Sequence, residues 1–423
     1  MRHLVRHCGL SILFLTSLQS MAAPTDDGDA AALGLESAPV QSTAPAANGR
    51  LFVEGVLGAA DQRYQSGWRG VGRGAVDWFH AQPLAPGWRA VISDRLDYVR
   101  PNGLGSDKTV NSLREAYVGW RSEPGNTVGE FGRVNLRFGP AYGYNPTDFF
   151  RDGSIRTATT VNPVTLREQR LGTAVVRAQR LWSGGSLAVA YAPKLASGSS
   201  SDGASLDLGA TNNRNRGLVA LGTQLSSRAS TTLLIYKEEG SPAQLGASAT
   251  ALLSDAVVAY AEGSRGREPD LRSRSLGQNE PRVTRNRFAG GLTYTTSTKL
   301  SLTAEYQYNG FALDREGFDS AAASGLGPIY LIEAFRRQDL ASRNAFLIYA
   351  VQKNAGLTNL DATVMVQLNA TDHSRLGWLE LRYHWARFDL AVQLQHESGN
   401  RASQYGQGLY RNAVQVLGAY YFQ

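Results

Sequence analysis

The chain has 423 residues, and its 43 Lys and Arg residues exceed its 36 Asp and Glu residues, which gives a formal charge of +7. The single cysteine, Cys8, excludes a disulfide framework and a cysteine-based metal site. No run of about 18 apolar residues follows residue 22, so the sequence also excludes a transmembrane helix beyond that point.

The first 22 residues are predicted to be a secretory signal peptide. Arg2 and Arg6 precede a short apolar segment over residues 10–18, and small residues lead to an expected cleavage site near Ala22. Residues 23–49 are rich in Ala, Pro, Ser, Asp and Thr, which predicts a disordered periplasmic tail. The remaining unit, residues 50–423, contains no thiol.

Apolar and polar residues alternate through many segments of this unit. The even positions of 300–309 are apolar or aromatic and the odd ones are polar, and segments 360–369 and 388–395 repeat the pattern. A helix would not sustain this period of two over ten residues. About 18 such strands (16–18) are predicted, and they begin near Leu51, Trp68, Trp88, Asn111, Val128, Gln169, Ser186, Gly217, Thr231, Leu245, Ala256, Arg285, Leu300, Asn344, Leu360, Leu376, Phe388 and Arg411.

The connections between these strands alternate in length. Tight turns are expected at 122–126, 183–185, 226–228, 254–255, 297–299 and 386–387, and long ones at 139–168, 195–214, 265–284, 312–341 and 398–410. Two connections on the same side as the long loops, near Gly240 and Thr371, are short. Short periplasmic turns and long extracellular loops are typical of bacterial outer-membrane barrels. The sequence therefore predicts an all-β, antiparallel transmembrane barrel in the outer membrane, with both termini in the periplasm.

The C-terminal residues 414–423 alternate in the same way and end on Tyr420, Tyr421, Phe422 and Gln423. They resemble the terminal β-signal of outer-membrane proteins, with Tyr420 and Phe422 as its aromatic residues, although here Gln423 follows the last aromatic. The resemblance implies insertion by the barrel-assembly machinery. The last strand must also pair with the first, near residues 51–60, so that no edge remains open.

A second resemblance covers roughly residues 131–193. Residues 132–139 end one strand, Asn145-Pro146-Thr147-Asp148 follows in the loop, and residues 166–172 start the next strand. This pattern resembles the alginate-export-type and related porin-like outer-membrane barrels. The resemblance implies an arginine-lined pore that exports an anionic polysaccharide.

Arginine is the dominant cation, because only five of the 43 basic residues are lysines. If the alternation holds, the lumen receives the side chains of Arg69, Arg73, Arg89, Arg95, Arg133, Arg137, Arg177, Arg285, Arg287 and Arg382, together with Glu305 and Glu380. These arginines could attract anions. Alternatively, they could pair with Asp77, Asp97, Glu305, Asp361, Glu380 and Asp389 on neighbouring strands. The sequence leaves both interpretations open.

The 139–168 connection is the predicted constriction of the channel. It follows arginine-bearing strands, and Asn145, Pro146, Asp148 and Arg151 are its candidate residues. Proline fixes φ and aspartate can bond the nearby backbone, so the segment has turn chemistry. The alternative is an ordinary surface loop.

The predicted function is an outer-membrane channel for anionic solutes, with export of an acidic exopolysaccharide as the cargo that the resemblance implies. The alternatives are an uptake porin for small anionic or aromatic solutes, a closed structural or adhesion barrel, and an outer-membrane hydrolase. For a hydrolase, His384 and His396 lie on adjacent strands near Ser398 and Asn400, but no nucleophile elbow is present.

No cofactor, metal or nucleic acid is expected, and the barrel is predicted to be a monomer. Its expected partners are outer-membrane lipid, lipopolysaccharide, the barrel-assembly machinery and polysaccharide-secretion components. Lipopolysaccharide phosphates are the nearest anions for the outward loop arginines Arg265, Arg267, Arg272 and Arg274.

Overall fold

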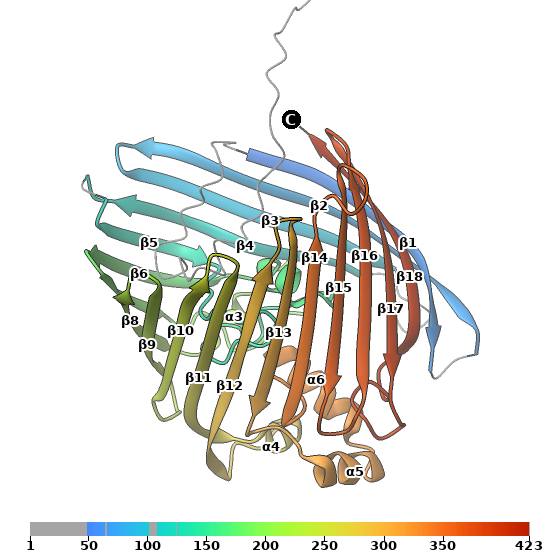
Figure 1. The fold of residues 1–423 in the computed structure, drawn as a ribbon. Coiled ribbons are helices and arrows are strands. Elements are labelled where there is room, and N and C mark those ends of the chain that lie inside the picture. The colour runs from blue at the N-terminus through green and yellow to red at the C-terminus, as the bar shows by residue number, and fades with distance from the viewer. Residues whose placement is uncertain (1–48, 64–65, 101–107, 124, 423) are drawn as a thin grey trace, which may run out of the picture.

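Eighteen antiparallel strands form one closed sheet in the computed structural model, which describes residues 49–63, 66–100, 108–123 and 125–422 (Figure 1). Each strand pairs with its neighbours in sequence, and β1 pairs with both β2 and β18. The structure therefore confirms a β-barrel of 18 strands. The predicted signal peptide and periplasmic tail, apart from Gly49, lie outside the described residues.

The strands begin within four residues of the predicted positions. They are β1 (Gly49–Gln62), β2 (Trp68–Ala85), β3 (Trp88–Arg100), β4 (Lys108–Arg121), β5 (Thr127–Val134), β6 (Thr173–Trp182), β7 (Gly185–Ala192), β8 (Arg216–Ser226), β9 (Ala229–Glu238), β10 (Gln244–Ser254), β11 (Val257–Pro269), β12 (Arg282–Thr295), β13 (Leu300–Asn309), β14 (Asn344–Gln352), β15 (Leu360–Asn369), β16 (Arg375–His384), β17 (Phe388–Ser398) and β18 (Tyr410–Phe422).

The helices all lie in the long connections at one end of the barrel or inside it. They are α2 (Pro163–Glu168), α3 (Leu208–Thr211), α4 (Leu271–Ser275), α5 (Arg315–Ala323) and α6 (Gly327–Arg337). In Figure 1, α4, α5 and α6 lie at the lower end, and the C-terminal end of β18 lies at the upper end with the short turns. Among the described residues, no helix is long and apolar enough to cross a membrane.

Side-chain exposure follows the predicted alternation. On β17, Leu390, Val392 and Leu394 are exposed on the outer surface, whereas Asp389 and Ala391 at the alternate positions are buried inside. Apolar outer positions on neighbouring strands give the barrel an apolar exterior, which is stable only in contact with lipid. The fold is thus that of a transmembrane barrel of the bacterial outer membrane.

The ring closes through the strand that was predicted to close it. Leu51 of β1 lies opposite Phe422 of β18, and the pairing continues to Gln62 and Tyr410 with one irregularity near its end. Tyr420 and Phe422 are exposed on the lipid-facing surface. Their position agrees with the resemblance to a β-signal, while recognition by the assembly machinery remains a prediction.

One boundary prediction was wrong. The alternation suggested that β5 continues to residue 138, but the strand ends at Val134. Gly132 adopts a φ of +129°, and Glu130 and Arg133 on either side of it are both buried. This irregular residue shifts the parity of the strand, so that Glu130, at an even position, and Arg133, at an odd one, are both buried. Arg137 consequently lies in the loop after β5.

We predict that Gly132→Ala destabilises the barrel by about 1–3 kcal/mol, because a side chain is strained at this φ. An added Cβ would also lie 2.3 Å from the carbonyl oxygen of Ala116. Denaturant unfolding of the detergent-solubilised barrel measures the effect. Gly129→Ala is the matched control, since its Cβ would meet only Trp120 at 3.8 Å. Equal midpoints for the two variants would contradict the prediction.

Candidate functional site: a loop-filled lumen

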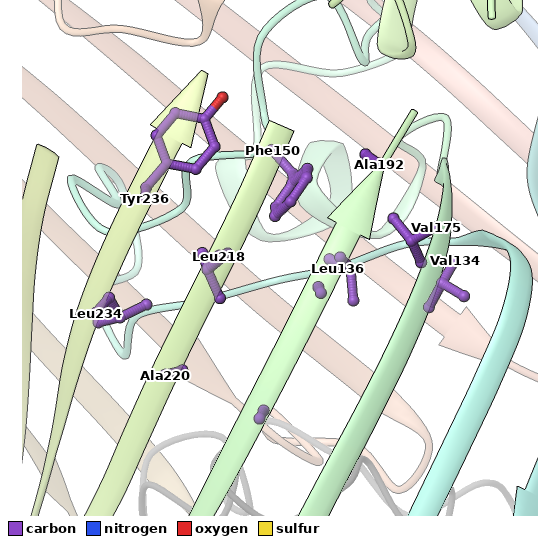
Figure 2. Packing of buried hydrophobic residues seen from close by; sticks show 11 residues of the cluster. Val134, Leu136, Phe150, Val175, Ala192, Leu218, Ala220, Leu234 and Tyr236 are labelled. Atoms are coloured by element: carbon purple, nitrogen blue, oxygen red, sulfur yellow. The ribbon is translucent and has the colours of Figure 1, made fainter. Parts of the chain in front are cut away.

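The connection between β5 and β6, residues 135–172, folds into the barrel and is called the inner loop below. Leu136 and Phe150 of this loop pack on the inner wall against Leu218, Leu234 and Tyr236 of β8 and β9 (Figure 2). The ring of Phe149 stacks on Tyr236 with 4.7 Å between centroids. Apolar burial therefore fixes one side of the inner loop to the wall formed by β6–β9.

Two buried glutamates hold the other side of the inner loop. Glu305 of β13 accepts hydrogen bonds from the backbone N–H groups of Tyr142 (2.7 Å), Gly143 (3.1 Å) and Tyr144 (3.2 Å). Glu262 of β11 accepts bonds from the N–H groups of Ala141 and Thr147, both at 3.0 Å. Because β13 lies almost opposite β5 in the ring, these contacts show that the inner loop crosses the lumen.

The four predicted constriction residues are all buried inside the barrel. Asn145 donates to Glu262 at 3.0 Å, and Pro146 precedes Thr147 at the same carboxylate. Asp148 has no exposed surface and lies 2.5 Å from Arg170 and 3.5 Å from Arg167. The alternative of an ordinary surface loop is thus wrong in geometry, although a role of these residues in conduction stays a prediction.

A second connection, residues 310–343 with α5 and α6, lies over the inner loop and is called the cap loop. Asp339 of the cap loop pairs with Arg287 of β12 at 2.8 Å and with Arg151 of the inner loop at 3.2 Å. Arg337 pairs with Asp152 at 2.8 Å. Ion pairs thus join wall, inner loop and cap loop into one unit.

These loops leave a cavity of about 360 Å³ between themselves and the wall formed by β13–β17. Its lining mixes apolar, amide and charged side chains, among them Leu331, Phe335, Met365, Gln367, Arg170 and Glu397. A smaller cavity of about 50 Å³ lies on the other side of the inner loop and is lined by Arg137, Arg177 and Gln179 together with residues of β7–β10.

Half of the ten predicted luminal arginines form ion pairs with carboxylates, and these are Arg73, Arg95, Arg177, Arg287 and Arg382. Arg95 lies 2.8 Å from Glu54, 3.2 Å from Asp97 and 3.4 Å from Asp77. Arg73 pairs with the same Glu54 at 2.8 Å. These contacts link β1, β2 and β3 across the inner surface, so here the cross-strand pairing interpretation describes the geometry.

The other predicted arginines differ widely in environment. Arg287 is buried between Glu268 and Asp339, and Arg382 pairs with Glu380 at 3.0 Å and with Asp389 at 3.6 Å. Arg133 is buried and donates to the carbonyl of Leu206 and the hydroxyl of Thr211. The residues that remain exposed or partly exposed are Arg69, Arg89, Arg137, Arg177 and Arg285.

Two predicted pairings do not form. Glu305 binds the inner loop and has no arginine partner among the described residues. Asp361 pairs with Lys353 at 2.9 Å and with His384 at 3.3 Å. Both carboxylates face inward as the alternation predicted, but their partners come from segments that the strand pattern could not place.

Sequence reasoning missed several residues that hold the lumen together. Glu262 lies at an inward position of β11, between Tyr260 and Ser264. Arg114 makes a bidentate contact to Asp77 at 2.7 and 2.8 Å. A register irregularity between Ser93 and Asp94 shifts the facing strand β4 at this point. An acid at an inward position of β11 was the available signal for Glu262.

The histidines considered for a hydrolase bind elsewhere. His384 bonds Asp389 at 2.9 Å, and His396 bonds Asn412 at 2.8 Å. Within the described ranges, no hydrogen bond joins either histidine to Ser398 or Asn400. The described residues also contain no group of three His, Cys, Asp or Glu side chains arranged to hold a metal ion.

No family model matches the chain, and no curated protein sequence matches it. Solved structures, in contrast, match it over most of its length. Acinetobacter baumannii OccAB1 superposes with a TM-score of 0.58 and 11% identity, over 89% of this chain and 96% of that chain. Pseudomonas aeruginosa OccK5 (OpdH) superposes with a TM-score of 0.53 and 9% identity, over 88% of this chain and 97% of that chain. The chain has the fold of an outer-membrane porin.

Pseudomonas aeruginosa OccK8 (OprE) matches similarly, with a TM-score of 0.51 and 12% identity over 89% of this chain and 98% of that chain. These porin structures share the 18-stranded barrel with this chain. They support the porin-like part of the resemblance found in the sequence and give no support to its alginate-export part.

We predict that Glu262→Gln loosens the inner loop, because the carboxamide –NH₂ replaces one of the two oxygens that accept bonds from Ala141 and Thr147 and cannot accept that bond. Leaving one such buried donor unpaired costs about 1–3 kcal/mol. Single-channel conductance in planar bilayers should rise or become noisy, and the inner loop should become protease-sensitive. Glu123→Gln, in an exposed turn, is the control. Unchanged conductance and proteolysis in Glu262→Gln would refute this anchoring role.

Asp339 makes the attachment of the cap loop dependent on pH. Burial opposes ionisation, but Arg287 and Arg151 outweigh it and hold the pKa of Asp339 below its usual value. The stability from this carboxylate is therefore present above pH of about 4 and is lost as the pH falls further.

We predict that Asp339→Asn lowers the unfolding free energy at pH 7 by about 3–5 kcal/mol, because Arg287 loses a buried partner. The variant should also lose less stability than the wild type between pH 5 and pH 2. Denaturant titrations over this range test both effects. Asp319→Asn removes an exposed acid of α5 and serves as the control. A pH dependence identical to that of the wild type would count against the assignment.

Proposed function

We propose that this barrel is an uptake channel that passes small organic anions across the outer membrane by diffusion. The observation that carries the proposal is a row of partly exposed arginines along one side of the lumen. The porin fold supports a channel and favours uptake of small solutes over export of a polymer.

The arginine row comprises Arg137 of the inner loop together with Arg177 and Arg89, which lie on β6 and β3 of the adjoining wall. Arg137 borders the smaller cavity beside the inner loop and forms no ion pair with another described residue. Arg177 of β6 lies further along the wall and pairs with Glu130 at 2.7 Å. Arg89 lies near the short-turn end, where it donates to the hydroxyl of Tyr117 at 3.2 Å. Successive weak cationic contacts favour entry of an anion and still allow its release.

The larger cavity supports a small cargo. Its volume of about 360 Å³ lies within the range of small-molecule sites. Leu331, Phe335 and Met365 provide an apolar surface for the body of a solute. A small solute with an apolar or aromatic body fits this cavity, and the arginine row on the other side of the inner loop favours a solute that also has an anionic group.

Export of an acidic exopolysaccharide is disfavoured by the inner loop. A linear polysaccharide needs an unobstructed bore, whereas the inner loop contacts both walls of the lumen. The closed structural barrel remains the competing proposal, and conductance in planar bilayers separates it from a channel. A monomeric state and assembly by the barrel-assembly machinery are kept as proposals.

We predict that Arg137→Ala reduces the anion-to-cation permeability ratio roughly two- to fivefold, as expected for loss of one weakly screened charge. Reversal potentials in planar bilayers measure the ratio, and liposome swelling compares benzoate-sized anions with neutral sugars. Arg375→Ala, which removes an exposed arginine of β16, is the matched control. If the wild type shows no conductance, the channel proposal is wrong. If the anion-to-cation permeability ratio is unchanged in Arg137→Ala, Arg137 does not contribute to the pathway.

A further inference from the structure

The outer surface of β11 changes from apolar to basic near its long-loop end. Its outward positions Ala259, Ala261 and Gly263 are followed by Arg265 and Arg267, both exposed. The inward positions on the same stretch, Glu262 to Glu268, are buried. The two guanidinium groups therefore lie on the lipid-facing surface of the barrel, where β11 leaves the membrane.

No carboxylate of the described part of the chain neutralises this pair. Among the described residues, neither Arg265 nor Arg267 forms an ion pair, and the one printed bond of Arg265 goes to the amide oxygen of Asn286 at 3.2 Å. The neighbouring strands β10 and β12 contain no Asp or Glu. Glu262 and Glu268 of β11 point to the other face of the sheet, so they cannot compensate these charges.

Apolar side chains adjoin the arginines on the membrane side. Leu245 of β10 lies opposite Arg265 and is 57% exposed, and Phe288 of β12 lies opposite Gly263 and is 39% exposed. A ligand at this place thus meets two cations at one end and hydrocarbon at the other. Charge complementarity and amphipathy together specify an anionic lipid.

We propose that Arg265 and Arg267 form a binding site for the phosphate group of a phosphorylated lipid in the outer leaflet, with its acyl chains against Leu245 and Phe288. Residues two apart on a strand are separated by about 7 Å, so their guanidinium groups can converge on one phosphate. Arginine suits this ligand, because its planar fork donates two parallel hydrogen bonds to phosphate oxygens. The long-loop end of β11, which leads to α4, faces the outer leaflet.

Lipid A is the probe for this site, because it is the phosphorylated lipid of that leaflet. The full-length barrel is inserted into nanodiscs of phosphatidylcholine that contain a small fraction of labelled bisphosphorylated lipid A. Native mass spectrometry counts the retained lipid, and dilution with unlabelled lipid gives its relative affinity. We expect R265A/R267A to bind lipid A at least tenfold more weakly than the wild type and R265K/R267K to bind with intermediate affinity.

The matched control is R100A/R375A, which removes two exposed arginines that lie apart on β3 and β16. It has the same loss of charge and should bind like the wild type. Heat-modifiable migration in gels verifies that each variant is folded. Dephosphorylated lipid A should bind the wild type no better than it binds R265A/R267A, and inorganic phosphate at millimolar concentration should compete poorly.

Three results would overturn the proposal. The first is equal affinity of R265A/R267A and the wild type for lipid A. The second is a loss of lipid A affinity in R100A/R375A as large as that in R265A/R267A. The third is wild-type binding of dephosphorylated lipid A that is as tight as its binding of lipid A. Dimers that form in the nanodiscs and dissociate in R265A/R267A would assign the patch to a second copy of the chain and overturn it as well. Ion conductance does not depend on this outer site, so these results test the lipid site and leave the channel proposal unaffected.

Discussion

Ring closure is the constraint on which the rest of the structure depends. A membrane offers no water to strand edges, so the backbone groups of β1 and β18 must find each other. Once they do, every strand has two neighbours, and the period of two in each strand assigns side chains to lipid or lumen. Most outer positions can then be apolar because they contact lipid, and most polar side chains must be accommodated inside.

The interior meets this demand mainly by pairing charges. Asp77 forms ion pairs with Arg95 and Arg114, and Asp339 forms ion pairs with Arg287 and Arg151. Such buried pairs contribute modest net stability, but loss of one partner leaves an isolated charge in a poorly solvated space. Half of the predicted luminal arginines thus have a structural role, whereas Arg137, which forms no ion pair with another described residue, retains a charge that a solute could meet.

The sequence predicted the wall better than its contents. Alternation in β13 and β17 is regular because each strand has one lipid face, and it placed all strand starts within a few residues. It failed where the backbone is irregular, as at Gly132, because one positive φ reverses which side chains point inward. It could place Glu305 inside but could not identify its partner, since hydrogen bonds to loop N–H groups leave no trace in strand periodicity.

The inner loop also separates two properties that a simple barrel would couple. The number of strands sets the circumference of the ring, but the free passage is what remains beside a loop held by Glu262, Glu305 and the cluster around Tyr236. Substitutions within residues 135–172 can therefore reshape the passage while the lipid-facing surface stays constant. Under the proposed channel function, such a barrel can acquire a new cargo through changes in one loop, without any change in its lipid-facing surface.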